Sequence, residues 1–319
     1  MISVNRVADT LVEKLCNDAE RYGLRVSKTE SGATLIDAGI EVKGGFAAGK
    51  IITEICMGGY GKADVLMKQY EDLELPTIFV YTDHPAIATL GSQFAGWQIK
   101  GHSFFALGSG PARALALKPK DIYEKIRYED KANNGTIVLE TSKKPPEKLI
   151  EKLASECKIA PNRLFVILTP TTSIAGSTQI SGRVVETGMH RLAKLGLDPT
   201  LVAHAWGYAP ITPVHPEFIE AMGRTNDAIM YAGTAYYALN SNSDEKLKTI
   251  VRKAPSNASK LYGKSFKEIL KEANNDFYRV DSNLFAPAVL IVNNLETGMV
   301  FRAGEFNIKV LKRSIGLMD

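Results

Sequence analysis

The sequence predicts a mixed α/β protein, with α+β as the alternative class, on the basis of three observations. Apolar segments of strand length alternate along the chain with segments of helical periodicity. The chain has 319 residues, enough for two domains or one large one, with a core that needs no disulfides. Hydrophobic residues make up 45% and charged residues 23%, which is typical of a soluble globular protein and argues against disorder.

The N-terminal elements follow from periodicity and from glycine. Over 3–22, apolar side chains recur at helical spacing, and Gly23 is placed to stop the helix. Glycines bound a short strand at 32–39. Helical character returns over 46–57 and is broken by the glycines at 58–61.

The next elements follow from runs of β-branched and aromatic residues. Strands are expected over 77–82, 101–107 and 136–141. After the first of these strands, a helix is expected to start within 86–90. The glycine-rich turn at 108–111 opens a further helix, with Pro111 near its first turn.

The segment 143–146 is the best linker by composition, and it divides the chain into two expected domains, 1–145 and 146–319. The C-terminal strands can also return to the first domain. Beyond the linker, helices are expected over 147–157, 179–195, 216–222 and 264–274. Strands are expected over 164–169, 286–292 and 299–303.

Charge and cysteine content exclude several classes of protein. The 39 Lys and Arg exceed the 35 Asp and Glu by only 4, which is too little to indicate a nucleic-acid partner. No apolar run approaches the ~20 residues that cross a bilayer, and the N-terminus lacks the apolar core of a signal peptide. Three widely spaced cysteines fit a reducing cytosol. We therefore expect a cytoplasmic protein without nucleic-acid or membrane partners.

No metal site is predicted. The five histidines form no ligand pair such as HExxH, and no CxxC pair exists. A metal site assembled from distant residues is an alternative that no spacing supports. His84 and His215 each precede a proline, which indicates turns.

Two glycine motifs nearly match nucleotide-binding sites. From Gly44 to Lys50 the spacing is that of a P-loop, but Ile51 replaces the hydroxyl residue that binds magnesium. We interpret this segment as a glycine turn that leads into a helix. At Gly108 the start of a dinucleotide fingerprint is broken by Arg113 at the third glycine position. That turn either presents N–H groups to an anion or is an ordinary helix cap.

The segment 169–190 carries the strongest signal for chemistry. A strand leads into a loop of small and hydroxyl side chains and then into a helix, which is where α/β proteins bind ligands. One polar stripe of that helix holds Gln179, Arg183, Glu186 and His190. The stripe is either a solvated face with an ion pair or part of a binding site. Gly182 and Gly188 favour the binding site, because each costs about 1 kcal/mol in a helix unless a ligand or another backbone approaches closely.

Five segments carry a resemblance to a known family: TDHPA at 82–86, SQ and AGW at 92–97, LGSGPARA at 107–114, SGRVVE at 181–186 and AMGRTNDAI at 221–229. None of them is a widespread motif. Together they make nearly the whole chain resemble the methenyltetrahydromethanopterin cyclohydrolases, one-carbon enzymes of methanogenesis.

The resemblance implies a homotrimer of two-domain α/β subunits, with the domains side by side and a pocket between them. It implies reversible hydrolysis of the 5,10-methenyl-tetrahydromethanopterin cation to the N5-formyl compound, with no metal and no redox cofactor. The catalytic pair of the family is carried over to Arg183 and Glu186. Substrate contacts are expected from Ser92, Gln93, Ser109, Gly110, Arg113, Gln179 and Arg224.

The chemistry of this reaction explains the residue types. Water must lose a proton as it attacks the amidinium carbon between N5 and N10, and N10 must gain one before the C–N10 bond breaks. One carboxyl group can do both jobs in turn, and Glu186 is the candidate. Arg183 can orient that carboxyl group and bias its protonation. Arg113 and Arg224 are candidates to hold the anionic tail of the substrate.

Two other function classes are alternatives. A nucleotide-dependent oxidoreductase or kinase would need the motifs that are broken here. A non-catalytic pterin-binding protein would have no use for the carboxyl group of Glu186.

Overall fold

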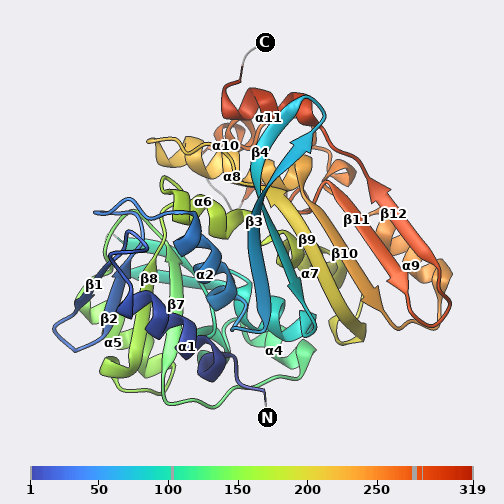
Figure 1. The fold of residues 1–319 in the computed structure, drawn as a ribbon. Helices are drawn as coiled ribbons and strands as arrows, with labels where there is room; N and C mark the ends of the chain where they lie inside the picture. Colours follow the sequence, from blue (N-terminus) through green and yellow to red (C-terminus); the bar gives the residue numbers. More distant parts are fainter. Residues whose placement is uncertain (1, 102–103, 275–278, 282, 318–319) are drawn as a thin grey trace. The chain divides into compact units, whose positions relative to one another are not determined.

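A computed structural model describes residues 2–101, 104–274, 279–281 and 283–317 (Figure 1). The chain forms two compact units, each built on a six-stranded mixed sheet. Unit 1 comprises residues 1–62 and 86–179, and unit 2 comprises residues 63–85 and 180–319. The expected mixed α/β class is therefore confirmed.

The sheet of unit 1 combines parallel and antiparallel pairs. Its strand order is β1 (Arg25–Lys28), β2 (Thr34–Asp37), β8 (Leu164–Leu168), β7 (Gly135–Glu140), β6 (Phe104–Ser109) and β5 (Trp97–Gly101). The three central strands β2, β8 and β7 are parallel neighbours, and the outer pairs are antiparallel. Parallel strands are buried on both faces, which explains the continuous apolar runs at 137–139 and 164–168.

Helices supply the two cores of unit 1. Val138 and Ile167 point to a core formed with α1 (Val4–Asn17) and α2 (Phe46–Cys56), which lie on one face of the sheet in Figure 1. Their sequence neighbours point to the opposite core, formed with α5 (Glu147–Glu156). This alternation is the two-residue period of a strand. The remaining helical segments are the π-helix η1 (Ala86–Gln93), α3 (Ala112–Ala116), α4 (Lys120–Ile126), the 3₁₀ turn η2 (Pro161–Arg163) and α6 (Ile174–Ser181).

The sheet of unit 2 is mainly antiparallel. Its strand order is β12 (Val300–Gly304), β11 (Val289–Asn294), β10 (Thr234–Leu239), β9 (Val202–Pro210), β4 (Leu73–Thr82) and β3 (Gly61–Tyr70). Strands β10 and β11 are parallel, and β9 pairs antiparallel with both β10 and β4.

Helices of unit 2 pack on this sheet and on one another. Helix α7 (Val184–Lys194) contacts β9 and β10, whereas α9 (Asp244–Arg252) contacts β11 and β12. Helix α8 (Phe218–Ala232) packs against β9, α10 (Phe266–Glu272) and α11 (Ile308–Ile315). Short 3₁₀ turns lie at Pro199–Leu201 and Ser256–Ala258.

Most predicted elements are confirmed, with shifted ends. The first helix starts at Val4, capped by Ser3, but ends at Asn17 rather than at 22. The helix expected from 86 is present as the π-helix η1. Helix α8 extends ten residues beyond the expected end at 222, to Ala232. The expected strand 101–107 overlaps β5 and β6, and its residues His102 and Ser103 lie outside the described residues.

The helix expected over 179–195 is two helices in the structure. Helix α6 ends at Ser181, and α7 begins at Val184. The hydroxyl of Ser181 donates to the carbonyl oxygen of Pro210 at 2.8 Å, which ties the end of α6 to the end of β9. Gly182, the poorest helix former in the stretch, lies in the break.

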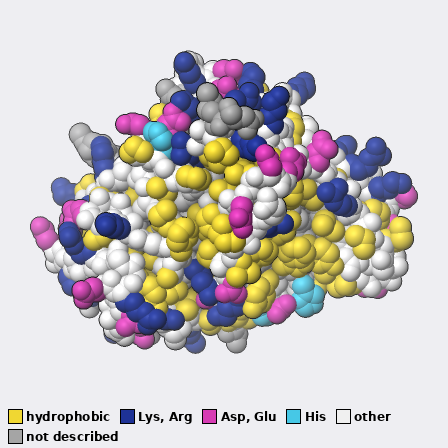
Figure 2. Space-filling view, turned by 45° about the horizontal axis from the view of Figure 1, so that its top comes forward, with side chains coloured by type: hydrophobic (Ala, Val, Ile, Leu, Met, Phe, Trp, Pro, Cys, Tyr) yellow, Lys and Arg dark blue, Asp and Glu magenta, His cyan; other side chains and the backbone are white. Residues whose placement is uncertain are grey.

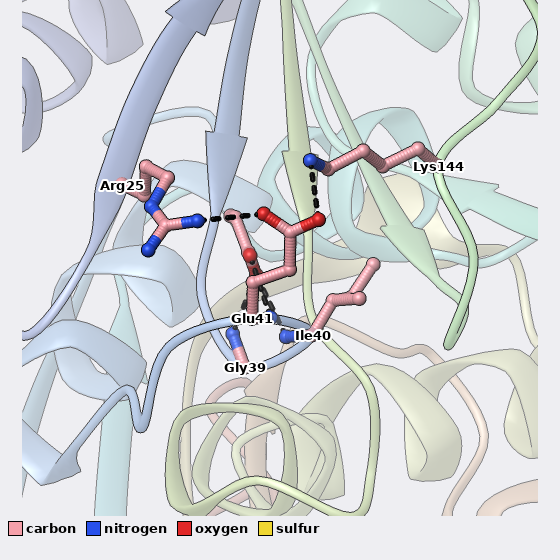
Figure 3. A network of polar contacts seen from close by, with 6 residues as sticks. Arg25, Gly39, Ile40, Glu41 and Lys144 are labelled. Carbon is pink, nitrogen blue, oxygen red and sulfur yellow. Dashed lines mark hydrogen bonds and ion pairs between the residues drawn. The ribbon is translucent and has the colours of Figure 1, made fainter.

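The two units divide the chain differently from the expected domains 1–145 and 146–319. Strands β7 and β8 lie on opposite sides of the expected linker, yet they pair in one sheet. The linker itself belongs to unit 1, where the Nζ of Lys144 lies 2.7 Å from Glu41, whose other oxygen binds Arg25 of β1 (Figure 3). The C-terminal strands β11 and β12 remain in unit 2.

Candidate active site

The predicted catalytic pair lies at the start of α7. Arg183 occupies the N-cap position, and Glu186 lies in the first turn. The carbonyl oxygen of Arg183 accepts from the main-chain N–H of Thr187 at 2.8 Å and from its hydroxyl at 2.9 Å, which closes that turn. Because the N-terminus of a helix carries partial positive charge, this position favours the ionised form of a carboxyl group.

The polar stripe of the sequence does not form a solvated face. Glu186 is only 5% exposed and Arg183 only 7%, and Gln179 is almost fully buried. Burying charged groups is unfavourable unless other groups compensate their charge. The solvated-face interpretation is therefore wrong for these three residues, whereas His190 is half-buried.

Tyr237 of β10 anchors the same turn, and the sequence reasoning did not identify it. Its hydroxyl donates to the carbonyl oxygen of Val185, the residue before Glu186, at 2.7 Å. Burial raises the pKa of Tyr237 well above its usual value, and the negative charge of Glu186 raises this pKa further. The sequence carries one signal for this contact, which is the glycine at position 188 within a helix. In the structure, a Cβ at Gly188 would lie 2.2 Å from the tyrosine hydroxyl oxygen, so only glycine leaves room for it. A ligand or another backbone was expected to approach Gly188, but in the structure a side chain, that of Tyr237, takes this place.

The predicted substrate contacts of unit 1 converge on the C-terminal end of η1. The main-chain N–H of Gly110 donates to the carbonyl oxygen of Ser92 at 2.9 Å, and the hydroxyl of Ser109 donates to that of Gln93 at 2.6 Å. The Ser92 hydroxyl donates to the carbonyl oxygen of Cys56 in α2 at 2.6 Å. The structure thus brings these four residues together, and their hydroxyls and N–H groups bind the main chain.

Arg113 belongs to the same cluster and is completely buried. Its Nη1 lies 3.1 Å from the carbonyl oxygens of both Leu90 and Ser92, and its Nε donates to that of Lys118 at 2.8 Å. The last carbonyls of a helical segment have no partner inside the segment, and a cation there is favourable. Arg113 therefore closes the π-helix, and its expected contact with substrate stays a prediction.

Gln179 contacts Cys56 of α2 within unit 1, and Arg224 lies on α8 of unit 2. The amide nitrogen of Gln179 lies 3.4 Å from the hydroxyl of Thr169, and its oxygen lies 4.0 Å from the Sγ of Cys56. Arg224 is half-buried on α8, and its Nη1 donates to the carbonyl oxygen of Pro213 at 3.1 Å. Arg224 therefore belongs to unit 2 and Gln179 to unit 1.

The segment that nearly matches a P-loop is a glycine turn before α2, as interpreted. Gly44 has a φ of +61°, and Gly45 is the N-cap of α2. Gly49 has a packing role, because a Cβ there would lie 2.5 Å from the Cβ of Thr178 and 2.8 Å from the Ala175 carbonyl oxygen. The glycine thus allows α2 and α6 to approach closely.

Within the described ranges, no group of three or more His, Cys, Asp or Glu side chains could hold a metal ion. None of the helices in the described part of the chain has both the length and the apolar character needed to span a bilayer.

Comparison with known proteins gives matches over almost the full chain. A profile of the protein family described as Cyclohydrolase (MCH) matches residues 3–315. The methenyltetrahydromethanopterin cyclohydrolase of Methanothermobacter marburgensis is 45% identical over 322 residues, covering 99% of this chain and 100% of the relative. The protein of the same name from Methanocaldococcus jannaschii is 44% identical, with 99% of both chains covered. That from Methanospirillum hungatei is 44% identical, with 100% of both chains covered.

Proposed function

The chain belongs to the methenyltetrahydromethanopterin cyclohydrolase family, and from this premise we propose how its own residues carry out the reaction. The protein is a cyclohydrolase that interconverts the methenyl and formyl forms of a tetrahydromethanopterin. The proposal concerns which side chains move the protons and which hold the substrate.

Glu186 is the group that moves the proton. As water attacks the carbon between N5 and N10, the carboxylate accepts one water proton, and a neutral hydroxylated intermediate forms. The same proton then passes to N10, the C–N10 bond breaks, and the remaining hydroxyl proton leaves as the N5-formyl carbonyl forms. The observation that supports this role is a carboxyl group only 5% exposed in the first turn of a helix.

Arg183 orients this carboxyl group. It lies three residues before Glu186 at the N-cap of the same helix, so the two side chains leave neighbouring positions of one turn. A guanidinium group beside a carboxyl group favours the ionised state, which is the form that accepts the proton from water. Lysine cannot replace it fully, because an ammonium group lacks the planar fork that holds a carboxylate.

Arg224 is the arginine best placed to bind an anionic group of the substrate. Its side chain is half-buried, and among the described residues its Nε has no hydrogen-bond partner. Arg113, by contrast, directs three donor contacts to main-chain carbonyls. Ser92, Gln93, Ser109, Gly110, Arg113 and Gln179 remain proposed substrate-binding residues, and their main-chain contacts support a role in shaping that part of unit 1.

The test of the proposed catalytic role is Glu186→Gln. We expect the variant to fold and to keep its KM, with kcat lower by about 10²- to 10⁴-fold, the usual contribution of a positioned acid–base group. Methenyl-pterin hydrolysis followed by absorbance measures both constants. Glu268→Gln is the matched control, because Glu268 is a carboxylate of unit 2 that caps α10. A Glu186→Gln enzyme within twofold of wild type would refute the assignment.

We further propose that the protein is a cytoplasmic homotrimer. The three cysteines are free thiols, which suits a reducing compartment. Exposed apolar side chains support an assembly interface: hydrophobic side chains gather on the face shown in Figure 2, and Tyr81 and Trp206 of unit 2 are 51% and 40% exposed. Light scattering should give about three times the chain mass of 34.8 kDa. A mass near that of one chain would overturn the proposal.

A further inference from the structure

We propose that Tyr237 is a positioning residue for the cyclohydrolase reaction, holding the turn of α7 that carries Glu186. The inference rests on the proposed catalytic role of Glu186 and adds a second residue that acts through it. Tyr237 need not touch the substrate for this role, because its hydroxyl binds the helix main chain.

Tyr237 occupies a rigid place in the sheet. It lies on β10, paired with Ala205 of β9 on one side and Val292 of β11 on the other, and it is completely buried. Its hydroxyl reaches the carbonyl oxygen of Val185, and the N–H of Met189 also lies close enough to the hydroxyl to lower its pKa. The contact therefore links the centre of the sheet to the first turn of α7.

The chain keeps a glycine in α7 that makes room for this hydroxyl. A Cβ at Gly188 would lie 2.2 Å from the Tyr237 oxygen, closer than real Cβ contacts allow, and 3.2 Å from the ring carbon that bears it. Glycine within a helix costs about 1 kcal/mol relative to alanine. A phenylalanine on β10 would fill the same core without placing an oxygen at this point, so the arrangement is specific to the hydroxyl group.

The contact acts on the backbone next to the reacting carboxyl group. Because Val185 immediately precedes Glu186, fixing its carbonyl group limits the rotation that reorients the Glu186 side chain. The two groups also interact electrostatically, since the charge of Glu186 disfavours ionisation of the phenol. Tyr237 therefore stays a protonated donor while Glu186 changes its charge, which keeps the anchor in place through both proton transfers.

Tyr237→Phe removes only the oxygen. We expect kcat to fall about tenfold, since a small misplacement of a catalytic group has effects of this size, while KM stays within twofold. The pH profile of kcat should also shift, because the main chain that orients the Glu186 carboxyl group loses its hydrogen bond from Tyr237. Gly188→Ala displaces the same hydroxyl from the other side and should shift the profile in the same direction.

Tyr231→Phe is the matched control. Tyr231 is equally buried in unit 2, and its hydroxyl also donates to a main-chain carbonyl, that of Lys264, but it lies on α8. This variant should change thermal stability without changing the pH profile. An unchanged profile in Tyr237→Phe, or an equal shift in Tyr231→Phe, would overturn the proposal.

The double variant separates this proposal from the one on which it rests. If Tyr237 acts through Glu186, then Tyr237→Phe should change kcat by less than twofold in a Glu186→Gln background. A full tenfold loss in that background would overturn the positioning role. Activity of Glu186→Gln alone would instead refute the catalytic assignment, so the two failures give different results.

Discussion

Arg113 in unit 1 and Arg183 in unit 2 are both buried arginines, and they meet opposite ends of a helical segment. Arg113 belongs to α3, but its guanidinium group binds carbonyl oxygens of Leu90 and Ser92 at the C-terminal end of η1, where the helix dipole favours a cation, and it also donates to the carbonyl oxygen of Lys118. Arg183 lies at the N-terminal end of α7, where the dipole disfavours a cation. Its position places it instead one turn from the carboxyl group of Glu186.

The difference separates a residue whose contacts hold the fold from one that we propose to act in the reaction. The contacts of Arg113 offset the cost of burying its charge within unit 1, and the rings of Phe94 and Tyr123 lie 5.3 and 5.6 Å from it. The dipole of α7 disfavours a cation at the position of Arg183, which is consistent with the proposed chemical role. The sequence predicted substrate binding for Arg113 and a place in the catalytic pair for Arg183.

The first and largest effect expected is on Arg113→Ala, which tests the structural half of this comparison. The substitution leaves three interior carbonyl oxygens without their charged donor, so the free energy of unfolding should fall by about 3 to 5 kcal/mol. Urea denaturation of the variant and of wild type measures the change. If Arg113 also contacts the substrate, KM of the folded fraction should rise more than kcat falls. Unchanged stability would remove the distinction between the two arginines.

Arg183→Ala tests the other half. We expect activity to fall by about 10²-fold or more and the pH optimum to shift, because Glu186 loses the cation that favours its ionised form. The free energy of unfolding should change less than in Arg113→Ala. Kinetics across the pH range and a urea curve on the same preparation provide both numbers. If Arg183→Ala unfolds as readily as Arg113→Ala, the two arginines have the same kind of role.

Gly49→Ala sharpens the comparison within unit 1. An added Cβ would collide with Thr178 and with the main chain of α6, so stability should fall by about 1 to 3 kcal/mol. Gly45→Ala is the control, because a Cβ at the α2 N-cap meets no atom within 4 Å. Thermal melts of the two variants measure the difference. Equal melting temperatures would mean that α2 and α6 can move apart without loss of stability, which would contradict the prediction.

Asp227 in unit 2 is expected to make stability depend on pH. Burial is the main cause that raises the pKa of Asp227 to about 7, and the charge of Glu268 acts in the same direction. The hydrogen bonds from the Ser314 hydroxyl and the Phe266 N–H lower this pKa, as does the charge of Arg313. The unfolded group releases its proton near 3.8 and the folded one near 7, so its stabilising contribution is lost as pH rises between them. Wild type should therefore lose stability relative to Asp227→Asn between pH ~4 and ~7. Urea curves at several pH values test this, and parallel pH dependences would contradict it.

Glu41→Gln should have the smallest effect. Its carboxylate bridges Arg25 and Lys144, and the hydrogen bond from Lys144 is the main reason that its pKa is lowered (Figure 3). The group is fully exposed, so water and salt screen the interaction. The melting temperature should barely change, and salt should remove any difference. A large loss of stability would show that this surface network holds the linker segment 143–146 in unit 1.

Local patterns in the sequence were sufficient for the elements whose burial repeats regularly. Strands β7 and β8 are predicted correctly because parallel central strands are apolar on both faces. Helix α5 is predicted because its buried side chains keep helical spacing. Strand β9 was not predicted, because the alternating buried positions in its middle are Ala205, Gly207 and Ala209, whose small side chains give no apolar alternation.

The sequence by itself determined the family, because its local motifs are unusual in composition, and the pair Arg183 and Glu186 stays a prediction from that resemblance. Only the tertiary structure decided where the units divide, since the pairing of β4 with β9 joins residues more than 100 positions apart. It also decided that Gln179, Arg183 and Glu186 are buried, and that Arg113 binds the end of η1 while Tyr237 binds the start of α7. These contacts depend on which distant carbonyl group a donor meets, and no local pattern carries that information.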